Sequence, residues 1–216
     1  MPKYRISKSF TWQGTVTDKV VSVCRMFGLT IDRLKEQCRI HSCKLEMNPG
    51  DIVYITGPSG AGKSVLMREL EKAIPAEDRI NLAQIELPCD KTVIDCINGG
   101  FLSSLRLLST AGLNDCFCIL NQPSKLSEGE QYRFRLAMAL ATEKKYIFAD
   151  EFCSELDRIT AASVSHQLRK FANKTGTTFI LASSHEDMLL DLAPDVLVTK
   201  DLSCSTRVVY KDSGRR

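Results

Sequence analysis

The sequence lacks long hydrophobic runs: nothing in its 216 residues approaches the ~20 consecutive apolar residues that a membrane-spanning helix needs. Residues 1–5 lead into an alternating segment and not into an apolar signal core, so we expect a cytoplasmic chain without membrane insertion. Strong net charge is also missing. A formal charge of +3 is too small to argue for a nucleic-acid or membrane-surface partner, and it leaves nucleic acid undecided.

Paired metal-binding or redox cysteines are absent as well. The nine cysteines include no C-x-x-C pair and no histidine at the spacing of a zinc site. We therefore expect reduced and mostly buried thiols. No internal repeat or low-complexity linker occurs, and a chain of this length suits one domain, or one domain with a small inserted lobe.

Short apolar runs alternate with amphipathic segments, which predicts an α/β fold with a mainly parallel core sheet covered on both faces. A helical stretch of about 88–143 is the candidate second unit. The expected strands are 4–12, 39–47, 51–56, a short one within 77–86, 146–149, 177–182, 195–199 and 205–210. The expected helices are 18–27, 65–73, 91–113 with a break at Gly99-Gly100, 130–143, 157–173 and 186–192.

Residues 57–64 fit the phosphate-loop pattern G-x-x-x-x-G-K-[ST] at every fixed position, between an apolar strand and a helix. Such glycines let successive backbone N–H groups surround a polyphosphate, and the helix N-terminus adds partial positive charge. Lys63 is expected to reach the β- and γ-phosphates, and Ser64 to bind Mg²⁺. A chance glycine-rich turn is disfavoured because both flanks match. The expected nucleotide-binding residues are Gly57, Pro58, Ser59, Gly60, Ala61, Gly62, Lys63, Ser64 and Val65.

A second signal is the apolar run 146–149, which ends in two carboxylates. In open α/β sheets ligands bind at the carboxyl ends of strands. Asp150 is expected to hold Mg²⁺, directly or through water, and Glu151 to polarise an attacking water as general base. The alternative interpretation is an exposed acidic turn.

A third signal is the segment 126–131, Leu-Ser-Glu-Gly-Glu-Gln. Ser127 followed by Glu130 predicts a capping box at the start of a helix. A helix N-terminus that carries a serine and a glycine is also a potential anion site. The local residues alone leave the structural and the anion-binding interpretations equally open.

The three signals occur in the order found in ATP-binding-cassette (ABC) ATPases, and the chain resembles that family over nearly its whole length. The matches are residues 57–64 to the Walker A motif, 126–131 to the signature motif, 146–151 to Walker B, 154–157 to the D-loop, 183–185 to the switch-histidine loop and Gln84 to the Q-loop glutamine, which Thr92-Val93 follow at about the family's spacing.

The resemblance implies an α/β P-loop NTPase with an ABC-type nucleotide-binding fold: a mainly parallel core sheet, an antiparallel edge region and a small helical subdomain. Residues 1–216 would form this single domain, with the subdomain inserted at about 88–143 between the Q-loop and Walker B. It also implies ATP hydrolysis with Mg²⁺ as cofactor. The metal ligands carried over from the family are Ser64, Gln84 and Asp150.

The resemblance further implies an ATP-dependent homodimer. Each ATP would lie between Walker A of one subunit and the signature residues Ser127 and Gly129 of the other. His185 would contact the γ-phosphate and join Glu151 and Lys63 as a catalytic residue. Asp157 would couple the two sites across the interface.

ABC ATPases stack an aromatic residue, found upstream of Walker A, on adenine. Phe27 is the first candidate by position, with Tyr4 and Trp12 after it. Simple core packing is an equally open interpretation for all of these side chains.

Three departures weaken a transporter assignment. The segment between Gln84 and the signature, where transporter subunits dock on membrane partners, is compact; Glu128 replaces a usual glycine; Phe152 replaces a usual proline. These details resemble a soluble ABC ATPase lineage described as fused to a predicted acetyltransferase domain. We do not expect an acetyltransferase domain within these 216 residues.

We therefore expect a soluble stand-alone ABC ATPase, whose ATP-driven dimerisation acts on an unknown protein, such as a separate acetyltransferase, or on nucleic acid. The alternative is the nucleotide-binding subunit of an ABC membrane transporter, with a permease as partner. A third class, an ATP-gated dimerisation switch that does not hydrolyse ATP, is disfavoured because Glu151 is present.

Overall fold

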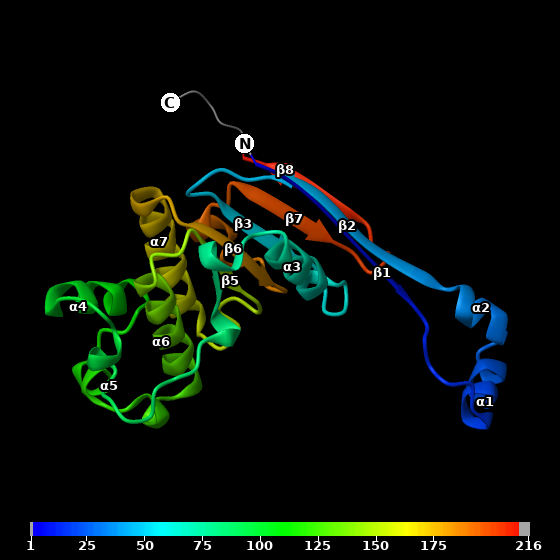
Figure 1. The fold of residues 1–216 in the computed structure, drawn as a ribbon, viewed down its shortest axis with the longest axis horizontal. Coiled ribbons are helices and arrows are strands. Elements are labelled where there is room, and N and C mark those ends of the chain that lie inside the picture. Colours follow the sequence, from blue (N-terminus) through cyan, green and yellow to red (C-terminus); the bar gives the residue numbers. More distant parts are fainter. Residues whose placement is uncertain (1, 212–216) are drawn as a thin grey trace.

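The computed structural model describes residues 2–211, which form two sheets flanked by helices (Figure 1). A two-stranded antiparallel ribbon pairs β1 with β2, and a six-stranded sheet has the order β4-β5-β6-β3-β7-β8. The strands are β1 Lys3–Thr11, β2 Cys38–Glu46, β3 Ile52–Thr56, β4 Arg79–Asn81, β5 Tyr146–Ala149, β6 Thr178–Ser183, β7 Val196–Lys200 and β8 Thr206–Tyr210.

Helices cover both faces of the larger sheet, and α1 and α2 lie at the far end of the two-stranded ribbon. The α-helices are α1 Asp18–Met26, α2 Ile31–Glu36, α3 Lys63–Lys72, α4 Phe101–Thr110, α5 Cys116–Leu120, α6 Glu128–Ala141, α7 Arg158–Thr175 and α8 Leu189–Leu192. Single 3-10 turns lie at Ala76–Asp78, Leu82–Gln84, Ile94–Cys96 and Pro123–Lys125. No helix within residues 2–211 combines the length and the apolar character required to cross a bilayer.

Strands β4, β5, β6, β3 and β7 run parallel, and only β8 is antiparallel, at the edge. The pairing aligns their carboxyl ends: Thr56 of β3 pairs with Ser183 of β6, and Ala149 of β5 pairs with Leu181 of β6. This arrangement confirms the predicted mainly parallel core sheet with an antiparallel edge region. The loops that follow these strands therefore emerge along one edge of the sheet.

Alternating residues of β3 divide the hydrophobic interior into two cores, because successive side chains of a strand point to opposite faces. Ile52 and Tyr54 join the core that contains residues of α6 and α7, whereas Val53 and Ile55 join the core that contains residues of α3 and of the ribbon. Helices α3 and α6 consequently cover opposite faces of the sheet.

Two helical groups lie toward opposite ends of the long axis (Figure 1). One is the helical unit, defined here as residues 94–141, which contains α4, α5 and α6. The other is the arm, defined as residues 12–37, which contains α1 and α2 at the far end of the β1–β2 ribbon.

The sequence pattern did not predict the two short helices α2, in the arm, and α5, in the helical unit. Helix α2 has six residues and α5 has five, too few for a helical hydrophobic period to be recognised. Each begins instead at a side-chain cap, Thr30 for α2 and Asp115 for α5. Of the helix expected over 91–113 with a break at Gly99-Gly100, the second piece is α4 and the first contains only the 3-10 turn Ile94–Cys96; the break itself is present, with Gly99 at φ +125°.

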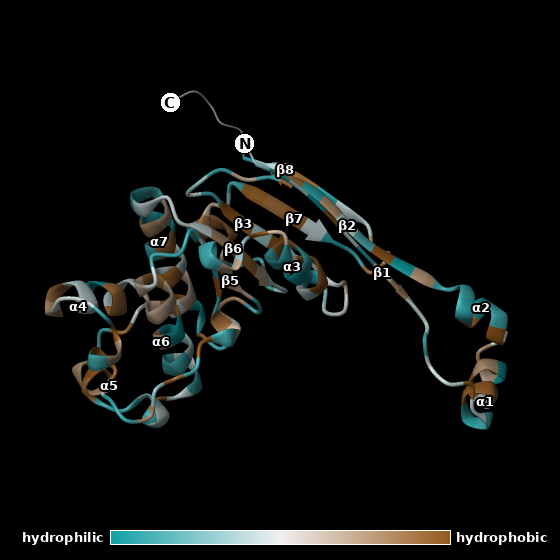
Figure 2. Cartoon of the chain, viewed as in Figure 1, coloured by the Kyte–Doolittle hydropathy of each residue, from teal (hydrophilic) through white to brown (hydrophobic). Residues whose placement is uncertain are grey.

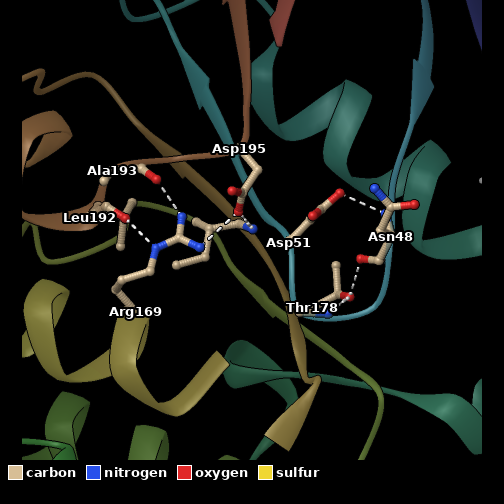
Figure 3. Close-up of polar contacts among 9 residues, drawn as sticks. Asn48, Asp51, Arg169, Thr178, Leu192, Ala193 and Asp195 are labelled. Atoms are coloured by element: carbon tan, nitrogen blue, oxygen red, sulfur yellow. Dashed lines mark hydrogen bonds and ion pairs between the residues drawn. The ribbon is translucent and has the colours of Figure 1, made fainter. Parts of the chain in front are cut away.

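One polar network fastens α7 to the edge of the sheet opposite the strand carboxyl ends (Figure 3). The Arg169 guanidinium donates hydrogen bonds to the carbonyl oxygens of Leu192 (3.0 Å) and Ala193 and to Asp195 Oδ2 (2.8 Å). Asp195 Oδ2 also accepts the Ile52 N–H at 2.8 Å, so the network reaches the first residue of β3. A planar guanidinium serves several acceptors at fixed angles, which suits this site better than an ammonium group.

We predict that Arg169→Met lowers the free energy of unfolding by about 2 kcal/mol, because it removes the guanidinium that serves the half-buried Asp195 carboxylate and two carbonyl groups. Arg169→Lys should recover only part of that loss. Urea unfolding followed by circular dichroism measures both. Lys72→Met breaks the exposed ion pair with Glu69 and is the matched control, expected to cost less than ~0.5 kcal/mol. Equal losses for Arg169→Met and Lys72→Met would contradict the assignment.

Candidate nucleotide-binding site

The predicted phosphate loop, carboxylate pair and switch histidine all lie at one edge of the central sheet. The phosphate loop follows β3, Asp150 follows β5, and His185 lies two residues after β6, the strand between β3 and β5. The Gln84 turn follows β4, the next parallel strand. Four segments that are far apart in the sequence therefore meet at the edge where α/β sheets bind ligands.

The phosphate loop leaves its backbone donors free. Among the described residues, no hydrogen-bond acceptor is found for the backbone N–H groups of Gly60, Gly62, Lys63 and Ser64. Lys63 folds back over the loop, and its Nζ donates to the carbonyl oxygens of Gly57 (2.7 Å) and Pro58 (3.2 Å). A ring of free N–H groups beside a lysine and a helix N-terminus is an anion cradle.

Two glycines of the loop are required by packing as well as by backbone turns. A Cβ on Gly57 would lie 2.1 Å from the carbonyl oxygen of Lys200, and one on Gly62 would lie 2.5 Å from the His41 ring. Both glycines also have positive φ, +142° and +89°. Neither contact could be foreseen from the motif, because the residues come from other strands.

The two carboxylates occupy a tightly constrained turn after β5. Glu151 has φ +50° and Cys153 has φ +58°, both in the left-handed region that these residues rarely adopt. Two bonds hold the turn: the Phe152 N–H donates to the Ala182 carbonyl oxygen (2.8 Å), and the Cys153 N–H donates to the Tyr132 hydroxyl (3.1 Å). Asp150 is half-buried and Glu151 is exposed, so both can meet a ligand.

A buried tyrosine positions the switch histidine. The Tyr54 hydroxyl, from the fully buried strand β3, donates to the His185 carbonyl oxygen at 2.5 Å, and the His185 N–H donates to Ser183 Oγ at 3.1 Å. Burial raises the pKa of Tyr54 to about 12, so it remains a donor at neutral pH. These bonds hold the backbone of the loop and leave the His185 imidazole exposed.

A buried glutamate that no sequence signal indicates positions Gln84. Glu71 of α3 is only 8% exposed; its Oε1 accepts Gln84 Nε2 at 3.2 Å and its Oε2 accepts Asn81 Nδ2 at 2.8 Å. With its amide nitrogen held in this way, Gln84 has its oxygen available as a ligand. Glu71 belongs to an ordinary helical pattern, which is why no motif marks it.

The residues proposed for Mg²⁺ fit a hard cation. Ser64 and Asp150 are half-buried, Gln84 is exposed, and each provides an oxygen at the edge described above. Hydroxyl, carboxylate and amide oxygens are the ligands that Mg²⁺ accepts. The hydrogen bond from the Gln84 amide nitrogen to Glu71 is the feature that favours presentation of oxygen rather than nitrogen.

The signature segment opens helix α6 on the helical unit. Ser127 and Glu130 form the predicted capping box: Glu130 Oε2 accepts the Ser127 N–H at 2.8 Å, and Ser127 Oγ accepts the Glu130 N–H at 3.4 Å. Ser127 and Glu128 are exposed. Because α6 and α3 cover opposite faces of the sheet, this helix N-terminus belongs to a different surface from the phosphate loop of its own chain.

Gly129 and Tyr132 connect the signature helix to the D-loop. A Cβ on Gly129 would lie 3.1 Å from the Glu155 carbonyl oxygen and 3.3 Å from Leu156, so a side chain here would be tightly packed against the D-loop. One helical turn on, the buried Tyr132 hydroxyl accepts the Cys153 N–H. Asp157 caps α7 and is exposed; bonds from Thr160 hold the pKa of its carboxyl below the usual value.

The structure does not bring Phe27 to the phosphate loop. Phe27 lies on the arm, 74% exposed, at the far end of the ribbon from the main body of the chain. Tyr4 bonds to the Tyr146 hydroxyl near the opposite end of the ribbon, and Trp12 packs against Gly14 within the arm. None of the three aromatic residues considered from the sequence adjoins Gly62.

The aromatic residue beside the loop is Phe10, which the sequence analysis missed. The His41 ring lies directly against Gly62, and Phe10 meets it edge-on with ring centroids 5.7 Å apart. Phe10 is 44% exposed, whereas His41 is 7% exposed and its Nδ1 is buried without a partner among the described residues. Burial, Lys200 and Arg39 lower the pKa of His41, so its ring is neutral at neutral pH.

Known proteins resemble the chain in sequence. Residues 40–96 match the family described as ABC transporter. The lipoprotein-releasing system ATP-binding protein LolD of Novosphingobium aromaticivorans is 26% identical, in an alignment covering 76% of this chain and 86% of LolD. The methionine import ATP-binding protein MetN of Streptococcus agalactiae is 27% identical over 73% of this chain, which spans 55% of MetN.

Solved structures share the fold. A dimeric structure of MJ0796, a bacterial ABC transporter cassette, superposes with a TM-score of 0.63 at 20% identity, covering 81% of this chain and 92% of that one. A post-hydrolysis dimer of MJ0796 bound to ADP and Pi superposes with a TM-score of 0.60 over the same shares of the two chains.

The fold and the phosphate-loop edge thus define a P-loop NTPase with the ABC ATPase fold. More particularly, the chain is similar in sequence to ABC-type ATP-binding proteins, through the family match over residues 40–96 and the relatives, and it is an ATPase. This confirms the predicted fold class and the predicted enzymatic activity.

We predict that Phe10→Ala weakens ADP binding about fivefold to tenfold, since loss of an aromatic stacking contact costs roughly 1–1.4 kcal/mol. Phe27→Ala should leave ADP affinity unchanged. Isothermal titration calorimetry with ADP, which avoids ATP-driven association, measures both. If Phe27→Ala weakened ADP binding and Phe10→Ala did not, Phe27 rather than Phe10 would be the residue that stacks on adenine.

Proposed function

We propose that the chain binds Mg·ATP at the described sheet edge and hydrolyses it within a two-fold dimer, so that the cycle of dimer closure and opening acts on a membrane partner. The observation that supports this most directly is the meeting of the phosphate loop, the carboxylate pair, the His185 loop and the Gln84 turn at one edge. The single ATPase domain would include the helical subdomain expected at about 88–143.

In the proposed reaction, the Glu151 carboxylate accepts a proton from water as the water oxygen attacks the γ-phosphorus of ATP. The bond from that phosphorus to the β–γ bridging oxygen breaks, which releases ADP and phosphate. Lys63 and the free N–H groups of Gly60, Gly62, Lys63 and Ser64 stabilise the phosphate oxygens, and His185 contacts the γ-phosphate. Mg²⁺, when bound by Ser64, Asp150 and Gln84, neutralises charge on the phosphates.

The proposed dimer follows from where the second anion site lies. A triphosphate has more anionic oxygens than one loop can satisfy, and the exposed N-terminus of α6 with Ser127 and Gly129 is suited to the remainder. Since α3 and α6 cover opposite faces of one chain's sheet, we infer that this helix comes from a second copy. The dimeric MJ0796 cassettes of the same fold support this arrangement.

The proposed partner is a membrane transporter component. The relatives described above carry the names of transport or lipoprotein-release ATP-binding proteins, and they support this reading better than the stand-alone ATPase that the sequence alone favoured. On the helical unit, Phe101 and Leu102 of α4 are 69% and 65% exposed. Neighbouring exposed apolar side chains of this kind are typical of a docking surface for another protein.

A stand-alone ATPase remains a second candidate because of one structural feature, the arm. A helical pair inserted between β1 and β2 adds a surface of its own to the ATP-binding domain. The finer resemblance to the acetyltransferase-associated lineage, carried by Glu128 and Phe152, stays a prediction. Fractionation separates the two candidates: a transporter subunit co-purifies with a membrane protein, whereas a stand-alone ATPase does not.

Glu151→Gln should lower kcat for ATP by about 100-fold or more, because it removes the general base, while ATP binding is retained. The variant should therefore accumulate as a dimer at saturating Mg·ATP, visible by size-exclusion chromatography. Lys63→Ala is the matched control and should fail to bind nucleotide and remain a monomer. A monomeric Glu151→Gln protein that has bound ATP would contradict the dimer.

Ser127→Arg should lower kcat for ATP hydrolysis by about 100-fold or more, because it blocks the proposed phosphate site contributed by the other subunit. Binding of ATP to the monomer should be unchanged, since Ser127 lies on another face of the chain. Single-turnover hydrolysis and calorimetric ATP affinity distinguish these effects. Ser127→Ala, which removes the cap without the bulk, controls for weakening of α6, expected at ~1 kcal/mol.

A further inference from the structure

The arm carries an apolar surface that nothing in the described chain covers. Met26 is 83% exposed, Phe27 74%, Val23 53%, Leu29 44% and Val16 41%. All lie on or beside α1, at the end of the molecule farthest from the helical unit, where Figure 2 shows hydrophobic residues. Contiguous exposed apolar side chains of this kind mark interaction surfaces in soluble domains.

A second uncovered apolar surface lies on α5 of the helical unit. Phe117 is 80% exposed and Leu120 is 66% exposed. The Cys118 thiol of the same helix donates to Glu130 Oε1 at 2.9 Å, and Glu130 belongs to the capping box that opens α6. Helix α5 therefore lies beside the α6 N-terminus, and a molecule bound at that N-terminus is also close to α5.

The proposed dimer brings these two surfaces together. The helical unit and the arm lie at opposite ends of the long axis, with α3 between them in this view (Figure 1). A second copy whose signature segment reaches the phosphate loop at the α3 N-terminus must bring its own helical unit to that region. A two-fold axis reverses the direction of the second copy, so its helical unit faces the arm of the first copy.

Two-fold symmetry also provides the reason for two different patches on one chain. In an isologous interface residue i of one copy contacts residue j of the other, and j contacts i, so both patches are covered twice. The net charges of the two surfaces are opposite in sign and therefore complementary: the arm has four basic and three acidic residues, whereas residues 115–131 have three acidic and one basic. Lipid-binding surface helices instead carry a strongly basic polar face, which the arm lacks.

We propose that the arm clasps a second copy of this chain, with Met26 and Val23 packing on Phe117 and Leu120 of the partner's α5. This inference rests on the proposed ATP-dependent dimer and adds a contact outside the nucleotide site. The nucleotide closes the dimer, and the arm extends the interface toward the end of each molecule. The arm therefore strengthens dimerisation without altering the affinity of the monomer for nucleotide.

The test uses the full chain with Glu151→Gln as the starting protein and measures dimer dissociation by analytical ultracentrifugation at saturating Mg·ATP. Adding Met26→Glu should raise the dissociation constant about tenfold or more, since it places a charge in an apolar contact. Phe117→Glu should do the same. Calorimetric ADP affinity should be unchanged in both. Leu190→Glu, at a side chain 92% exposed on α8, is the matched control and should leave dimerisation intact.

A charge pair tests direct contact between the two patches. Combining Met26→Glu with Phe117→Lys should restore dimerisation that each single change weakens, because the new charges attract across the interface. If neither Met26→Glu nor Phe117→Glu changes the dimer dissociation constant, the clasp is wrong, while the ATP-dependent dimer itself is not contradicted. Failure of the Glu151→Gln protein itself to dimerise overturns the ATP dimer and the clasp together.

Binding to vesicles of mixed anionic and neutral phospholipid gives an independent check. Vesicle binding that Met26→Glu abolishes, in a protein whose dimerisation is unchanged, overturns the clasp and assigns the arm to a membrane surface. No vesicle binding, combined with weaker dimerisation by Met26→Glu and its rescue by Phe117→Lys, supports the clasp.

Discussion

The hydrogen-bond register of the parallel sheet is the constraint on which the site depends. Strands β4, β5, β6 and β3 are bonded side by side in one direction, so the loops that follow them must emerge at a common edge. Because a strand that slips by one residue turns every side chain to the other face, the two cores lock this register. The position of each catalytic candidate is thus set by the burial of Ile52 to Ile55 in two separate cores, far from the chemistry itself.

Buried polar groups connect the loops at that edge to the cores beneath. Tyr54 holds the His185 loop, Tyr132 holds the turn after Asp150, and Glu71 holds Gln84. A buried hydroxyl or carboxylate keeps its place only when its bonds are made, so each of these contacts ties loop position to core packing. A glycine has a similar effect: Gly57 allows the Lys200 backbone to approach the phosphate loop where any side chain would clash.

A single chain of this fold holds the phosphate loop and the signature helix on different surfaces, and in the proposed function that separation makes association of two copies part of the reaction. The phosphate loop lies at the N-terminus of α3 and the signature serine at the N-terminus of α6, across the sheet from each other. In the proposed dimer, a second copy completes the shell of polar groups around the triphosphate. The arm and the α5 surface extend this reasoning beyond the nucleotide, because each leaves apolar area that one copy cannot cover.

Local sequence determined the phosphate loop, the carboxylate pair, the capping box of α6 and the mainly parallel sheet, because spacing and hydrophobic period specify these directly. It could not identify Phe10 as the aromatic residue beside the loop, nor Glu71 as the partner of Gln84, since both roles arise from contacts between distant strands and helices. Phe27 was placed by its distance along the chain, whereas the fold carries it away on the arm. Short segments such as α2 and α5 have too few residues to show a period, so only tertiary structure decided their conformation and exposure.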